Sequence, residues 1–276
     1  MTAPNPDGPA RLITHFTTRD RGKQIAGWSE LWDSDESDLW DRGKPSPALI
    51  DLIESRAEGI PRATGGRRPK VLVPGCGKGY DVVMLALHGF DVYGLEVSEK
   101  GAETARKYAE TELPEPTEYN FGTPDSVPGT WPGNIKIISG DFFERDWEEH
   151  CMASDEDAFR GFDLIYDCTF LCALLPEMRK DWAKRMHELL SPTGVLVCLE
   201  FPLYKDLNLL GPPWGLNGVY WNLLAEGGDG MIKEPLLENL DSKASAGSFK
   251  RVSYFKPPRS YKNGKGTDMV SVWARK

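Results

Sequence analysis

The sequence has few of the residues that crosslink small secreted proteins or hold metal ions. Its five cysteines contain no CxxC pair, so neither a disulfide framework nor a zinc site is expected, and reduced thiols favour a cytoplasmic protein. Its four histidines stand far apart and form no HExxH motif or other short ligand pair. We therefore expect no metal site.

Long apolar runs and positive net charge are also lacking. No window approaches the roughly 18 apolar residues that a membrane-spanning helix needs, and residues 1–20 hold no apolar signal segment. The 33 lysines and arginines are outnumbered by 42 aspartates and glutamates. This excess of negative charge gives no electrostatic footprint for nucleic acid or an anionic membrane, so a small-molecule partner is favoured.

What is present is typical of a globular protein, with 40% apolar and 27% charged residues in a chain of 276. The proline- and glycine-rich start predicts a flexible tail over 1–20. We expect an N-terminal helical cap over 21–68, because a basic, glycine-rich linker ends there. One α/β domain should fill 69–276, with insertions at 114–133 and 204–247 that have the length of lids or specificity segments.

The α/β prediction depends on short apolar runs that alternate with helical patterns. The predicted strands cover 71–73, 91–95, 135–138, 162–166, 195–199, 248–254 and 269–274. Helices are expected over 81–88 and, with Ser98 as N-cap, up to residue 111. The alternation predicts a doubly wound, mostly parallel seven-stranded sheet of the Rossmann-like class.

A further helix is bracketed by Pro176 and Pro192. Its apolar face is formed by Met178, Trp182, Met186, Leu189 and Leu190. Its polar face is formed by Arg179, Lys180, Lys184, Arg185 and Glu188. This periodicity predicts that the second set faces solvent.

The chemistry begins at a glycine turn after the first strand. Gly75, Gly77 and Gly79 separate a strand from a helix, which allows a tight turn whose backbone approaches a ligand at the helix N-terminus. Glu96 ends the second strand, where an acid can accept hydrogen bonds from ribose hydroxyls. The spacing disfavours NAD, because Tyr80 follows the third glycine and would crowd a pyrophosphate.

The segment VLVPGCGKG at 71–79 resembles motif I of the class I S-adenosylmethionine-dependent methyltransferases. Together with WSELW at 28–32, WD at 40–41, GDFF at 140–143 and FDLIYDCTFLCA at 162–173, it resembles the thiopurine and thiol/halide methyltransferase family. The likeness extends from about residue 27 to residue 213. It implies S-adenosylmethionine as cofactor and S-adenosylhomocysteine as product.

The resemblance also implies roles for individual residues. It implies that the tryptophans at 28, 32 and 40 close over the cofactor, although composition alone favours core packing for them. It implies that the backbone of the glycine turn contacts the cofactor. It also implies that the acid at the end of the second strand binds the ribose. The adenine would be held by the acid and the aromatic residue that follow the third strand. The implied cofactor-binding residues are Trp28, Trp32, Trp40, Gly75, Gly77, Glu96, Asp141, Phe142 and Cys168.

Asp167 and Cys168 follow the fourth strand, at the carboxyl edge where open α/β sheets bind ligands, and are the candidates for the acceptor side. A small buried hydrophobe is the alternative interpretation of Cys168. The thiol/halide branch commonly has tyrosine at this position, so the resemblance implies an altered substrate pocket and makes halide a doubtful acceptor.

The sequence is therefore interpreted as a methyltransferase that acts on a small soft nucleophile, most simply a thiol or sulfide. A thiol with a pKa near 8.5 is already a few per cent thiolate at neutral pH, so positioning and desolvation can supply much of the acceleration without a strong base. Two alternatives stay open: a small-molecule O- or N-methyltransferase, and a cofactor-binding protein without catalytic activity.

Overall fold

The computed structural model describes residues 8–62, 67–123, 132–151, 160–233 and 246–276. It contains one seven-stranded sheet with the order β3-β2-β1-β4-β5-β7-β6. The strands are β1 (Lys70–Pro74), β2 (Asp91–Glu96), β3 (Ile135–Ser139), β4 (Phe162–Cys168), β5 (Leu190–Glu200), β6 (Phe249–Phe255) and β7 (Met269–Arg275). The first five pair in parallel, and β7 runs antiparallel between β5 and β6. The predicted fold is confirmed.

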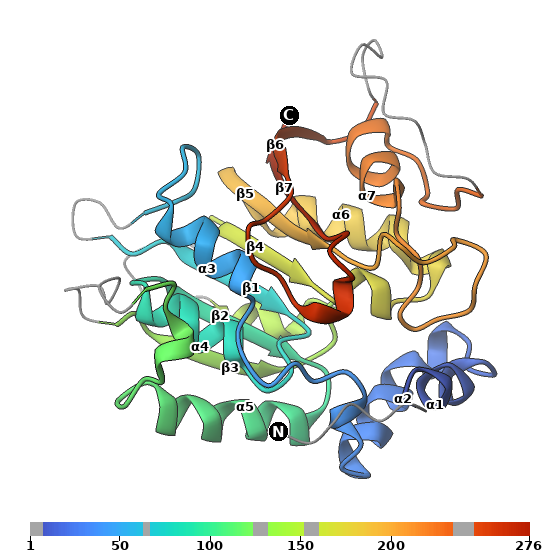
Figure 1. Ribbon diagram of the computed structural model, residues 1–276, viewed down its shortest axis with the longest axis horizontal. Coiled ribbons are helices and arrows are strands. Elements are labelled where there is room, and N and C mark those ends of the chain that lie inside the picture. Colours follow the sequence, from blue (N-terminus) through green and yellow to red (C-terminus); the bar gives the residue numbers. More distant parts are fainter. Residues whose placement is uncertain (1–7, 63–66, 124–131, 152–159, 234–245) are drawn as a thin grey trace.

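Helices cover both faces of the sheet (Figure 1). They are α1 (Gly8–Phe16), α2 (Arg21–Asp33), α3 (Pro47–Glu54), α4 (Tyr80–Leu87), α5 (Glu99–Glu112), α6 (Arg179–Leu189) and the short α7 (Val219–Trp221). One buried cluster joins α3 and α4 to the sheet, and the other joins α6 and α7 to its opposite face. The strands between these layers are near-continuous apolar runs because both of their faces are buried.

Local signals explain several helix ends. The Ser98 hydroxyl accepts the Gly101 N–H at the start of α5, and the Ser46 hydroxyl accepts the Leu49 N–H at the start of α3. Each hydroxyl satisfies one of the free amides in a first helical turn. Pro47 follows Ser46 as the first residue of α3, where its missing N–H costs nothing.

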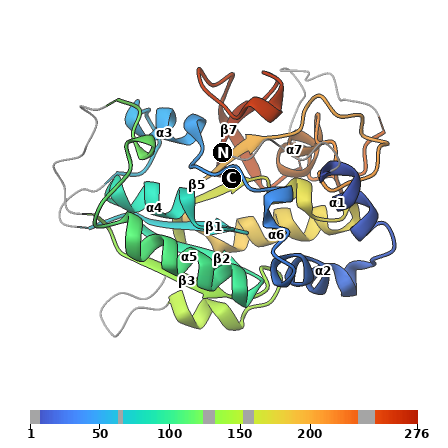
Figure 2. The same ribbon diagram turned by 60° about the horizontal axis from the view of Figure 1, so that its bottom comes forward.

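The N-terminal segment differs from the prediction. The flexible tail expected over 1–20 is wrong for residues 8–16, which form α1, while residues 1–7 lie outside the described part of the chain. Leu12 and Phe16 of this helix are buried against Leu31 of α2. Helices α1 and α2 lie together at one end of the strands (Figure 2). The predicted cap over 21–68 also includes α3, but α3 packs into the sheet core.

The predicted polar face of α6 is wrong at two positions. Arg179 and Arg185 are only 4% and 6% exposed. Arg179 donates to the carbonyl oxygens of Gly230 and Gly215 in the predicted insertion 204–247. Because a buried guanidinium needs acceptors, these carbonyls explain how the helix holds an arginine on a packed face.

Candidate active site

A pocket lies at the carboxyl edge of the sheet, where the strand order reverses between β1 and β4. Its walls are residues that directly follow β1, β2, β3, β4 and β5, and it is closed by α2, the segment 39–44, the two prolines at 212–213 and Tyr261. Open α/β sheets bind ligands at this kind of switch point. All nine predicted cofactor-binding residues line the pocket.

The glycine turn shapes the pocket floor in two ways. A Cβ atom on Gly75 would lie 2.6 Å from the ring of Phe170, whereas a Cβ atom on Gly77 would meet no atom within 4 Å. Both residues have positive φ, +59° and +56°, which glycine adopts without steric cost. Gly75 therefore lets an aromatic ring pack against the backbone, and Gly77 leaves open space for a ligand.

Glu96 ends β2 and is nearly buried in the pocket wall. Its Oε2 accepts the Gly77 N–H at 3.0 Å and its Oε1 accepts the Ser98 N–H at 3.2 Å. Burial raises the pKa of this carboxyl group, while hydrogen bonds from backbone amides and the Trp32 side chain oppose the shift. Glu96 is therefore a hydrogen-bond acceptor in the pocket wall that is held by the glycine turn and the start of α5.

The three predicted tryptophans come together on the cap side of the pocket. The ring of Trp40 lies 5.3 Å from that of Trp28 and 5.6 Å from that of Trp32, edge to face in both pairs. Trp32 is 4% exposed and packs so closely on α5 that a Cβ atom on Gly101 would lie 2.8 Å from it. The tryptophans therefore pack as a cluster and also line the pocket, and their closure over the cofactor stays a prediction.

Asp141 and Phe142 follow β3 on another wall of the pocket. Asp141 Oδ1 accepts the Phe143 N–H at 2.9 Å, which folds the chain into a tight turn. Phe142 is buried, and its ring lies 5.1 Å from that of Phe170. Aromatic surface beside a carboxylate suits a flat base that carries an amino group.

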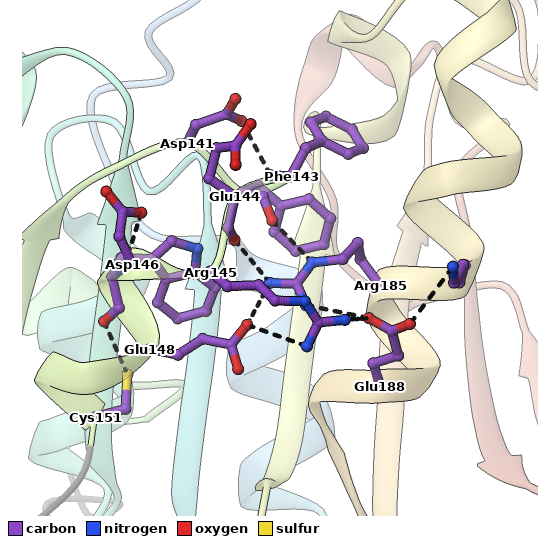
Figure 3. Close-up of polar contacts among 12 residues, drawn as sticks. Asp141, Phe143, Glu144, Arg145, Asp146, Glu148, Cys151, Arg185 and Glu188 are labelled. Atoms are coloured by element: carbon purple, nitrogen blue, oxygen red, sulfur yellow. Dashed lines mark hydrogen bonds and ion pairs between the residues drawn. The ribbon is translucent and has the colours of Figure 1, made fainter.

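Arg185 supports this wall from behind (Figure 3). Its guanidinium donates to the carbonyl oxygens of Phe142 and Glu144 at 3.1 and 3.0 Å. It also forms ion pairs with Glu148 at 2.8 Å and Glu188 at 3.2 Å. The buried arginine of α6 therefore ties that helix to the turn that carries Asp141 and Phe142.

Of the two acceptor-side candidates, only Cys168 lines the pocket. Asp167 is fully buried and accepts hydrogen bonds from Trp182 Nε1 at 2.9 Å and the Tyr220 hydroxyl at 3.2 Å. Burial raises its pKa to about 6. Asp167 therefore joins β4 to α6 and α7, and the structure does not place it where an acceptor would bind.

The pocket also contains residues that sequence reasoning missed. Asp41 forms an ion pair with Lys78 of the glycine turn at 2.6 Å, which ties the segment after Trp40 to the pocket floor. The guanidinium of Arg42 lies 5.6 Å from the centre of the Phe201 ring. Further lining residues to which sequence reasoning assigned no role are Lys44, Asp81, Thr169, Cys172, Pro212, Pro213 and Tyr261.

These residues fit a nucleoside cofactor with a sulfonium centre. Open space lies above Gly77, a buried carboxylate stands where ribose hydroxyls would bind, and aromatic rings surround the cavity. Among the described residues, no cluster of three or more His, Cys, Asp or Glu side chains could hold a metal ion. Within the same residues, no helix is long and apolar enough to cross a membrane.

Comparison with known proteins identifies relatives over most of the chain. The sequence model of one family, thiopurine S-methyltransferase, matches residues 23–228. A protein of Arabidopsis thaliana named probable thiol methyltransferase 2 is 36% identical over 188 residues, which cover 68% of this chain and 66% of that protein. Thiocyanate methyltransferase 1 of Brassica oleracea is 31% identical over 250 residues, or 90% and 84% of the two chains.

Among solved structures, the chain is similar to phosphoethanolamine N-methyltransferase 1 of Haemonchus contortus, solved with phosphoethanolamine and S-adenosylhomocysteine. The TM-score is 0.53 at 13% identity, and the match covers 94% of this chain and 50% of the other. At this identity the likeness shows the fold alone.

Proposed function

The chain belongs to the thiopurine S-methyltransferase family, and within that family we propose that it methylates the sulfur of a bulky aromatic thiol rather than a single small anion. Membership makes it an S-adenosylmethionine-dependent methyltransferase with a thiol-type acceptor. The observation that carries the narrower proposal is Cys168, a small side chain in a pocket that several aromatic rings also line.

When bound, S-adenosylmethionine supplies a methyl group on a sulfonium sulfur that a nucleophile can displace in line. We infer that Glu96 and the open backbone at Gly77 hold the ribose end, and that Asp141 and Phe142 hold the adenine. The tryptophans at 28, 32 and 40 exclude water and place aromatic faces around positive charge. These residues bind and orient the cofactor, and none of them needs to form a covalent bond with it.

The acceptor side supports a large apolar thiol. The rings of Phe170, Phe201 and Tyr261 and two prolines line the pocket with Cys168. A tyrosine at position 168 would fill part of this space and present a hydroxyl, which suits a single small anion. Because pocket volume and unpaired polar groups decide discrimination between substrates, the smaller cysteine favours the larger acceptor.

Two features support a reducing compartment and a small-molecule acceptor for this reaction. The five cysteines are all free, which fits a reducing compartment such as the cytoplasm. The net charge is −9, so the proposed acceptor is a small molecule and not a nucleic acid.

The test compares acceptors in the native protein and in Cys168→Tyr. We expect kcat/KM of the native protein to be highest for a bulky aromatic thiol, and the variant to shift toward iodide, hydrosulfide and thiocyanate. Cys168→Ser, which keeps the small size, should retain the native preference. A native preference for iodide, or no shift on substitution by tyrosine, would contradict the proposal.

The reaction class is tested separately with labelled cofactor and a panel of thiols, phenols, amines and halides. Label should appear on sulfur. Transfer only to oxygen or nitrogen, or to no acceptor at all, would favour the alternatives of an O- or N-methyltransferase or an inactive cofactor-binding protein.

A further inference from the structure

Asp81 is a pocket residue with no part in the roles described above. It is the second residue of α4 and lines the pocket, and its charge acts on Cys168 and Tyr261, which also line it. Its Oδ1 accepts the Ser46 N–H at 2.7 Å. Among the described residues, no hydrogen bond is found to its Oδ2 and no lysine or arginine forms an ion pair with it, so one carboxylate oxygen keeps its acceptor capacity.

The groups around Asp81 come from three elements and are neutral. They are Cys76 of the glycine turn, Tyr166 and Cys168 of β4, and Tyr261 of the C-terminal segment. Burial raises the pKa of each, and the negative charge of Asp81 raises it further. They therefore stay protonated near neutral pH, and Asp81 is the ionisable base among them.

The other acidic groups of the pocket have a partner or a proposed role of their own. Asp41 is paired with Lys78, and Glu96 and Asp141 are the proposed ligands of the ribose and the adenine. Arg42 acts on Cys168, where its positive charge favours the thiolate. Burial raises the pKa of Asp81 to about 6, so Asp81 remains ionised at neutral pH but holds a proton more readily than an exposed aspartate.

We propose that Asp81 is a catalytic residue that accepts the proton of the acceptor thiol. This inference rests on the proposed function. As the thiol sulfur forms its bond to the methyl carbon, its proton passes to Asp81 Oδ2, and the carbon–sulfonium bond breaks with its electron pair left on the cofactor sulfur. The products are a methyl thioether, S-adenosylhomocysteine and a protonated Asp81, which then returns its proton to water.

The consequence is a wider range of acceptors. A thiol with a pKa near 8.5 is only about 3% thiolate at pH 7, so an enzyme without a base would lose about 30-fold in rate with it relative to a fully ionised thiol. A base in the pocket removes this restriction. Asp81 therefore extends the substrate class from acidic aromatic thiols to weakly acidic ones.

The test is kcat/KM against pH for thiols of graded pKa, in the native protein and in Asp81→Asn. With a weakly acidic thiol, the native value should rise through about pH 6 and then level. In the variant, the rise should move to the pKa of the thiol itself, with a loss of about 30-fold at pH 7. Thiocyanate, which has no proton to give, should change less than about twofold.

Several results would overturn this role. An equal loss in Asp81→Asn for every acceptor, thiocyanate included, would make Asp81 a structural brace for Ser46, and no loss would remove it from the reaction. If the native protein methylates no thiol at all, the proposed function fails as well. If the native protein methylates thiols but Asp81→Asn has the same kcat/KM as the native protein for every thiol, the proposed function stands and only the role of Asp81 as a base is excluded.

Controls separate chemistry from folding. Asp51→Asn changes an aspartate outside the pocket that pairs with Arg259, and it should leave the whole series unchanged. Asp81→Glu keeps a carboxylate and should restore part of the lost rate for weakly acidic thiols. If Asp81→Asn does not fold, the pH profiles of the native protein still test the role of Asp81. A rise of kcat/KM at each thiol's own pKa would contradict a base in the pocket.

Discussion

The two halves of the pocket are built differently. In the half that we propose binds the cofactor, Glu96 ends β2, and Gly77 and Asp141 come just after β1 and β3. In the half that we propose binds the acceptor, Cys168 of β4 lines the pocket together with Asp81 of α4 and residues from segments far away in the chain. Strand ends of a parallel sheet meet at one edge by construction, whereas the acceptor half exists only once the whole chain is packed. Binding and specificity should therefore respond to different substitutions.

The largest expected effect concerns the support of the cofactor half. Arg185→Met leaves Glu148 and Glu188 without their buried partner and frees the carbonyls of Phe142 and Glu144. We expect the free energy of unfolding to fall by about 3 kcal/mol, because the carbonyls of Phe142 and Glu144 each lose a hydrogen bond from a charged donor, worth about 1.5 kcal/mol or more.

Urea denaturation measures this effect, with Lys184→Met as the matched control. Lys184 lies on the same helix with 73% of its side chain exposed, so its loss should change stability by less than about 0.5 kcal/mol. Similar effects of the two substitutions would show that the wall behind Phe142 needs no buried arginine.

The next effect separates cofactor binding from acceptor choice. Glu96→Ala should weaken S-adenosylhomocysteine binding by about 1.5 to 3 kcal/mol, since it removes a charge-assisted hydrogen bond in a buried site. Calorimetry measures the affinity, and Glu99→Ala, an exposed neighbour paired with Arg106, is the control. Unchanged affinity would mean that Glu96 does not bind the ribose.

The smallest effect concerns the contact between the cap and the pocket floor. Lys78→Met breaks the partly exposed ion pair with Asp41 and should weaken cofactor binding by about 1 kcal/mol or less. If Trp28, Trp32 and Trp40 form a mobile lid, hydrogen exchange around them should slow when S-adenosylhomocysteine binds, and less so in the variant. Equal protection with and without ligand would make the tryptophans ordinary packing residues.

Most of the fold could be predicted because its signals are local. Strands buried on both faces appear as short apolar runs, and Ser98 caps its helix through its own hydroxyl. Helix α1 was missed because prolines and glycine at its start hide a helix whose Leu12 and Phe16 depend on packing against α2. Arg185 was predicted as exposed because its carbonyl partners belong to another element.

The candidate site also contains residues that local sequence signals indicate and residues that depend on packing. Glycine spacing and an acid at the end of a strand indicated the cofactor half from sequence. Asp81 gave no signal, since an acid in the first turn of a helix is ordinary, and its raised pKa and its contact with Ser46 depend on the packing of the whole chain. Asp167 misled for the same reason, because adjacency to Cys168 in sequence does not decide which side chain faces the pocket.

The most direct test of the two-half account measures two quantities in two variants: the Kd for S-adenosylhomocysteine, and the ratio of kcat/KM for a bulky aromatic thiol to that for iodide. Glu96→Ala should weaken the Kd by about 10-fold to 150-fold and leave the ratio unchanged. Cys168→Tyr should lower the ratio and leave the Kd within about twofold. If Cys168→Tyr weakens cofactor binding as strongly as Glu96→Ala does, Cys168 belongs to the cofactor half and the division is contradicted.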